Sequence, residues 1–159
     1  MKHANTDDVT VVDFGAHFYP PEMEAPEQDL DKTSNDQFAG VDRKSDPETV
    51  LAEMDAAGVD AMVYSNTDYM GHDDADETVE ANDVLFEYIE DHEEFYGLGS
   101  IPIGDNGEAA AAEFERALDM GFQGGALHET EVELTDAEME PVLEVAEQTG
   151  APIFVHIPN

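Results

Sequence analysis

Residues 122–157 read FQGGALHETEVELTDAEMEPVLEVAEQTGAPIFVHI. The apolar runs at both ends, 122–128 and 152–157, predict two short strands. Between them Thr135 and Glu138 have the spacing of a helix capping box, and Gly150 is typical of the residue that ends a helix. Two strands joined by a helix predict a parallel pair with a right-handed crossover.

The same alternation extends back to the N-terminus. The run 9–14 predicts a buried strand, and Ser45 and Glu48 have capping-box spacing at the start of a helix that ends at Gly58. Further strands are expected at 61–64 and 96–103, and further helices at 77–92 and 107–120, the last capped by Asn106 and ended by Gly121.

Five parallel strands with four intervening helices predict an α/β fold, a partial (β/α)8 TIM barrel. A complete barrel of this kind needs about 250 residues. The 159 residues are therefore expected to form a single domain, 1–159, that corresponds to the N-terminal part of such a barrel. The open edges of this sheet predict a homo-oligomer, or a chain that needs the remaining strands.

Charge excludes several classes of partner. The chain has 40 Asp and Glu against 5 Lys and Arg, a formal net charge of −35. We therefore expect no nucleic-acid and no anionic-membrane partner. The acids lie between apolar positions along the whole chain, which favours a halophilic, haloarchaeal protein over two alternatives, a disordered chain and an acidic DNA mimic.

The sequence also has no apolar run long enough to cross a membrane and no apolar signal region at its N-terminus, so the protein is expected to be cytoplasmic. It has no cysteine, which excludes disulfides and thiolate chemistry.

Three histidines follow predicted strands: His17, His128 and His156. The carboxyl ends of parallel strands carry function in α/β folds, and imidazole is both a common metal ligand and a general acid or base near neutral pH. Each histidine alone is also compatible with a structural or surface role.

Three segments carry a family resemblance. The stretch VDFGAHFYP at 12–20 resembles the first-strand motif of the amidohydrolase-related TIM barrels, the group of the aminocarboxymuconate semialdehyde and resorcylate decarboxylases. Residues 121–128 and 151–156 are similar to the fourth and fifth strands of that family.

The resemblance implies a metal-dependent hydrolase or decarboxylase that acts on a small carboxylate or cyclic substrate. His17 and His156 would be metal ligands, with zinc favoured and manganese the alternative, and His128 would contact the small-molecule substrate.

Two departures from the family keep other functions open. Gly15 stands where the family usually has its first histidine, and the chain lacks the sixth-strand histidine and the eighth-strand aspartate. The chain is therefore interpreted as a truncated enzyme, with a non-catalytic remnant or binding module of the same fold as the alternative.

Overall fold

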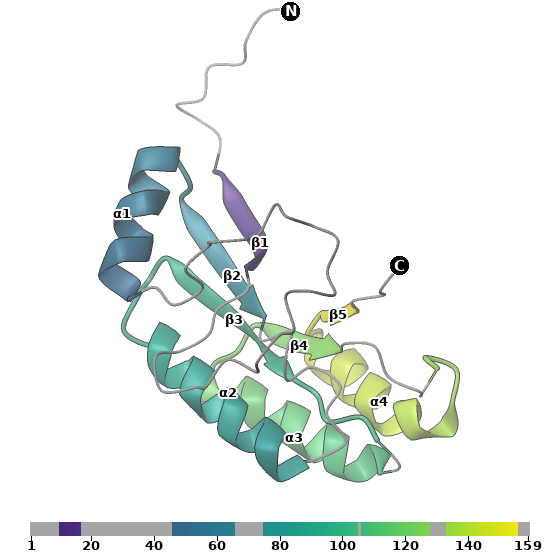
Figure 1. Ribbon diagram of the computed structural model, residues 1–159. Coiled ribbons are helices and arrows are strands. Elements are labelled where there is room, and N and C mark those ends of the chain that lie inside the picture. The colour runs from purple at the N-terminus through teal and green to yellow at the C-terminus, as the bar shows by residue number, and fades with distance from the viewer. Residues whose placement is uncertain (1–9, 17–45, 66–74, 105, 128–132, 156–159) are drawn as a thin grey trace, which may run out of the picture.

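A computed structural model describes residues 10–16, 46–65, 75–104, 106–127 and 133–155 (Figure 1). Strands and helices alternate along these residues. The strands are β1 (Val12–Ala16), β2 (Ala61–Ser65), β3 (Phe95–Ser100), β4 (Gly124–Leu127) and β5 (Ile153–Val155). The helices are α1 (Pro47–Ala57), α2 (Ala75–Ile89), α3 (Gly107–Met120), the 3-10 turn η3 (Ala137–Met139) and α4 (Glu140–Thr149).

The five strands form one sheet in the order β1-β2-β3-β4-β5, and every neighbouring pair is parallel. The sheet curves, with the helices on its outer side (Figure 1). This arrangement confirms the predicted partial (β/α)8 barrel. None of the helices in the described ranges is long and apolar enough to cross a membrane.

The outer face of the sheet packs tightly against α2 and α3. A Cβ added to Gly97 would lie 2.6 Å from Ile89 Cδ1 and 2.7 Å from Phe122 Cδ1. Gly99 similarly faces Ala117 of α3. Only glycine fits at so close an approach of the helices to the sheet.

The inner face of the sheet has its own apolar layer. Leu98 and Ala126 are buried there, with Val63 and Phe154 packed against them. The ring of Phe14 meets that of Phe154 edge-on, with centroids 5.4 Å apart. Side chains from the first and fifth strands thus touch across the inner face although these strands do not pair.

The prediction of a buried first strand is wrong. Val11, Val12 and Phe14 are 43%, 50% and 57% exposed. β1 lies at the edge of the sheet, and within the described residues it pairs only with β2. Its apolar run has the composition of a buried strand, but burial requires a neighbour on each side.

Local caps explain most helix boundaries. Asn106 and Gly121 bound α3 as predicted, and Gly58 and Gly150 end α1 and α4 in the left-handed conformation. At α1, however, the capping residue is Asp46, whose carboxylate accepts hydrogen bonds from the Thr49 backbone N–H at 2.9 Å and the Thr49 hydroxyl at 2.7 Å. Ser45, the predicted cap, lies outside the described residues.

The predicted capping box of Thr135 and Glu138 does not form. Asp136 precedes η3, and its carboxylate accepts a hydrogen bond of 2.8 Å from the backbone N–H of Glu133. This side-chain contact closes a turn before the helix, so α4 begins only at Glu140.

Candidate active site at the carboxyl edge of the sheet

The carboxyl ends of all five strands lie at one edge of the sheet, because every pair is parallel. β1, β4 and β5 end at Ala16, Leu127 and Val155. The next residues in the chain are His17, His128 and His156, the three predicted site residues. All three lie outside the described residues, so their roles stay predictions.

The backbone at the end of β1 needs glycine. Gly15 has φ +84°, and the pairing of β1 with β2 shifts by one residue there, so that Ala16 rather than Gly15 pairs with Tyr64. A residue with a side chain is strained in this left-handed conformation. A histidine at position 15, as in the family motif, would therefore strain this bulge.

Two serines lie at the same edge, at the ends of β2 and β3. Ser65 is 1% exposed and Ser100 is fully buried. Neither hydroxyl has a hydrogen-bond partner in the structure as described. The sequence singled out neither serine, because the second strand was expected to end at residue 64 and the third to run on to residue 103.

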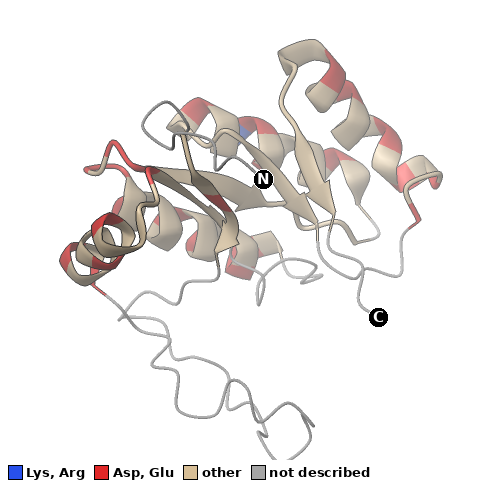
Figure 2. Ribbon diagram, turned by 90° about the horizontal axis from the view of Figure 1, so that it is seen from above, with Lys and Arg blue, Asp and Glu red and all other residues tan. Residues whose placement is uncertain are grey.

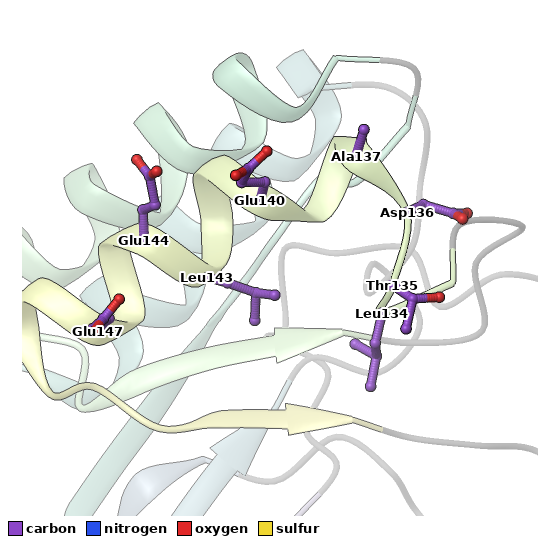
Figure 3. Close-up of a pocket in the computed structure, with 8 residues that line it drawn as sticks. All are labelled: Leu134, Thr135, Asp136, Ala137, Glu140, Leu143, Glu144 and Glu147. Atoms are coloured by element: carbon purple, nitrogen blue, oxygen red, sulfur yellow. The ribbon is translucent and has the colours of Figure 1, made fainter.

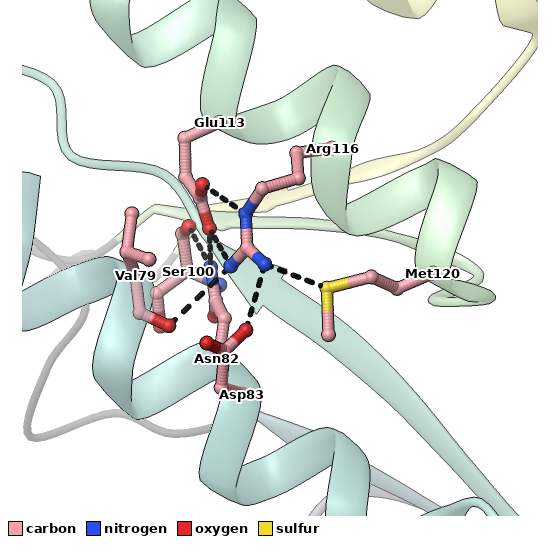
Figure 4. Close-up of polar contacts among 7 residues, drawn as sticks. All are labelled: Val79, Asn82, Asp83, Ser100, Glu113, Arg116 and Met120. Carbon is pink, nitrogen blue, oxygen red and sulfur yellow. Dashed lines mark hydrogen bonds and ion pairs between the residues drawn. The ribbon is translucent and has the colours of Figure 1, made fainter.

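A buried side-chain amide fixes the backbone at the end of β3 (Figure 4). Asn82 of α2 accepts a hydrogen bond from the Ser100 backbone N–H at 2.7 Å and donates one to the Ser100 carbonyl at 3.0 Å. Its amide also donates to Glu113 Oε1 of α3 at 2.7 Å. Asn82 thus ties two helices to the strand end that carries Ser100.

Glu113 is charged and only 5% exposed, and Arg116 neutralises it. The guanidinium donates to the carboxylate from Nε at 2.6 Å and from Nη2 at 2.8 Å, and to exposed Asp83 from Nη1 at 2.7 Å (Figure 4). The hydrogen bonds with Glu113 are the largest cause of a raised pKa of Arg116. This contact therefore adds to the preference of the guanidinium for its charged form.

Arg116 is the only Lys or Arg within the described ranges. Figure 2 shows acidic positions spread over the helices and their connections, with very little blue among them. The expectation that nucleic acids are not partners rests on the sequence charge and stays a prediction.

A surface depression of about 410 Å³ lies along η3 and α4 (Figure 3). Its lining includes the carboxylates of Asp136, Glu140, Glu144 and Glu147. The described residues contain no group of three or more His, Asp or Glu that could hold a metal ion. The depression is thus a solvated acidic surface and not a metal site.

The fold defines the class of protein. It is an α/β barrel protein, and proteins of this class carry their site at the carboxyl ends of the strands. The amidohydrolase family model matches residues 12–158. The chain therefore belongs to the amidohydrolase family, as its sequence motifs predicted. No protein of curated function matches the sequence.

Solved structures share the fold. A dihydroxybenzoic acid decarboxylase from a Polaromonas species, with bound manganese and 2-nitroresorcinol, is 20% identical with a TM-score of 0.76 over 94% of this chain and 50% of its own. A 2,6-dihydroxybenzoate decarboxylase bound to 2,6-dihydroxybenzoate is 23% identical with a TM-score of 0.75, over 94% and 51%.

The 5-carboxyvanillate decarboxylase of Novosphingobium aromaticivorans, with bound manganese, is 17% identical with a TM-score of 0.74, over 94% of this chain and 51% of its own. The chain thus spans about half the length of the solved structures that it matches.

Proposed function

We propose that this chain contributes half of the active site of a metal-dependent decarboxylase that acts on a small aromatic carboxylate. The main support for this proposal is that β1 and β5 end at the same edge of one parallel sheet. His17 is the residue that follows β1, and His156 is the residue that follows β5. The contact between Phe14 and Phe154 supports this proposal, because it brings the inner faces of these two strands together.

The proposed metal ligands, His17 and His156, supply only part of the ligands that a divalent metal needs. Two imidazoles suit zinc, whereas manganese favours oxygen ligands, and a catalytic zinc site usually has three protein ligands. His17 and His156 are the proposed ligands, and His128 is the proposed substrate contact. When bound, such an ion supplies Lewis-acid polarisation of a substrate oxygen. Three matched structures hold manganese, which favours manganese over zinc as the first ion to test.

Decarboxylation is favoured over hydrolysis because the matched structures with bound ligands include decarboxylases of dihydroxybenzoate and carboxyvanillate. The substrate class proposed for this chain is accordingly a hydroxylated benzoate. Completing the reaction would require ligands beyond His17 and His156, supplied by further strands of the barrel.

Manganese titration calorimetry in molar KCl tests the proposal. We expect binding by the wild type and a loss of affinity greater than about tenfold in His17→Ala and in His156→Ala, since even outer-shell partners of a metal contribute about 10–100-fold. His92→Gln is the matched control, because His92 lies between α2 and the start of β3, at the opposite edge of the sheet.

Equal affinity in His17→Ala and His92→Gln would overturn the assignment of the ligands. No manganese or zinc binding by the wild type would favour the second candidate, a non-catalytic remnant of the fold. Gly15 supports that candidate, because it leaves no ligand atom at the position of the family's first histidine.

A further inference from the structure

The hydroxyls of Ser65 and Ser100 are buried and have no hydrogen-bond partner in the described structure. A buried hydroxyl without a partner costs folding free energy, because it gives up its hydrogen bonds to water and gains none in return. Native proteins leave few such groups, and those that remain call for an explanation. Two of them occur here on neighbouring strands.

Both serines belong to the inner face of the sheet. Ser65 pairs in register with Leu98, and Ser100 pairs with Ala126. Leu98 and Ala126 form the buried inner layer with Val63 and Phe154 packed on it. Since alternate residues of a strand share a face, each serine lies two residues beyond an inner-face residue, at the carboxyl end of its strand.

The backbone does not need the Ser100 hydroxyl. Asn82 already satisfies the N–H and the carbonyl of Ser100, at 2.7 Å and 3.0 Å. The same amide is held in turn by Glu113. The strand end is therefore rigid while the hydroxyl that it carries stays unpaired, which is the arrangement of a preorganised binding group.

We propose that Ser65 and Ser100 form a subsite whose hydroxyls donate hydrogen bonds to the carboxylate oxygens of the substrate. This inference rests on the proposed function, which places the substrate at the same edge of the sheet. A neutral hydroxyl suits an anionic group here, because it can donate without bringing a charge of its own into the buried inner layer.

The test compares Ser65→Ala and Ser100→Ala with Thr149→Val. The Thr149 hydroxyl on α4 has partners, since it donates to the Val145 carbonyl at 2.7 Å and accepts from the Ala151 N–H at 3.3 Å. Thermal unfolding without ligand is measured for each full chain in molar KCl. Binding of 2,6-dihydroxybenzoate and of resorcinol, which lacks the carboxylate, is then measured by calorimetry with manganese present.

We expect each serine variant to unfold at a midpoint about 2–4 °C higher than the wild type, because an unpaired buried hydroxyl is removed. Its affinity for 2,6-dihydroxybenzoate should fall about tenfold, the value of one hydrogen bond to a charged group, while its affinity for resorcinol stays the same. Thr149→Val should unfold at a lower midpoint and bind both probes like the wild type.

Lower midpoints in both serine variants would overturn the proposal, because the hydroxyls would then be structural. Unchanged affinity for 2,6-dihydroxybenzoate in both, equal losses for the two probes, or no binding by the wild type would also overturn it. Manganese binding that needs His17 and His156 would keep the proposed function in each of these cases, so the two failures are distinguishable.

Discussion

Replacing Arg116 by methionine removes the cation that neutralises a buried carboxylate. Glu113 is 5% exposed, whereas the Arg116 side chain is 36% exposed. Breaking a fully buried ion pair costs about 3–5 kcal/mol, and an exposed pair is worth about 0–1 kcal/mol. Because Glu113 resembles the first case and Arg116 lies between the two, we expect Arg116→Met to lower the free energy of unfolding by about 2–3 kcal/mol.

Urea unfolding in 3 M KCl measures this loss, which corresponds to about 5–10 °C in the thermal midpoint for a chain of this length. Asp83→Asn is the matched control, because Asp83 also contacts Arg116 but is 54% exposed. We expect the control to change stability by less than about 0.5 kcal/mol. Salt screens buried pairs weakly, so the Arg116→Met loss should persist between low and high KCl.

A double-mutant cycle with Glu113→Gln isolates the pair. We expect the double variant to lose at least about 1 kcal/mol less than the sum of the two single variants, because glutamine carries no charge that needs Arg116. Additive losses, or an Arg116→Met loss no larger than that of Asp83→Asn, would refute the assignment of Arg116 as the partner of a buried charge.

Four further predictions concern the backbone, pH, salt and association. Gly15→Ala should lower the free energy of unfolding in urea by about 1–2 kcal/mol, because φ is +84° and an alanine is strained in this conformation. No atom lies within 4 Å of the added Cβ, so backbone strain and not a clash would cause the loss. Unchanged stability would contradict the left-handed bulge. Burial raises the pKa of Tyr88 to about 12. A tyrosine in the unfolded chain ionises first, at about pH 10, so stability should fall from about pH 10 to 12. Tyr88→Phe should reduce that slope in alkaline melts, and an unchanged slope would oppose the assignment. Raising KCl from 0.1 to 3 M should raise the thermal midpoint, because the Debye length shortens from about 10 Å to under 3 Å; a flat salt response would argue against a halophilic protein. Light scattering should show association through the edges of β1 and β5, and a monodisperse monomer would contradict it.

Local features of the sequence predicted the fold well. The bounds of α3 follow from Asn106 and Gly121. Both residues form hydrogen bonds only with backbone groups a few positions away in the sequence, so their effect can be predicted from the local sequence. The residue that caps α1 was harder to predict. Asp46 caps the helix, but the side chain of neighbouring Ser45 is also of a type that accepts the hydrogen bonds of a helix start. The type of an element is thus set by the local sequence, whereas its first residue depends on which of two adjacent polar side chains accepts the capping hydrogen bonds.

Burial was harder to predict because it depends on neighbours that are distant in the sequence. Leu143 and Val145 are both apolar residues of α4, yet Leu143 is 43% exposed and Val145 is buried. The 3-10 turn η3 has about 3.0 residues per turn and shifts the phase of the helix that follows it. Dependence on distant neighbours also explains the exposure of β1, because its apolar run does not reveal that the strand lies at the edge of the sheet.

The candidate site was predictable only in outline. The rule that function lies at carboxyl strand ends singled out His17, His128 and His156, all of which lie outside the described residues. The rule did not single out Ser65 or Ser100, because serine is common in loops and its significance here comes from burial without a partner. That property belongs to the packed structure and has no sequence pattern.

The contact between Phe14 and Phe154 has a consequence for the order of folding. Each strand pairs with the next one along the chain, so synthesis delivers the partners of the sheet one after another. Phe14 is the exception, because its ring meets that of Phe154, which lies four strands later in the sequence. The Phe14–Phe154 contact is therefore of much longer range in the sequence than the strand pairs, and it can form only after the strands between them have been made, so it belongs to the closing of the sheet rather than to its beginning.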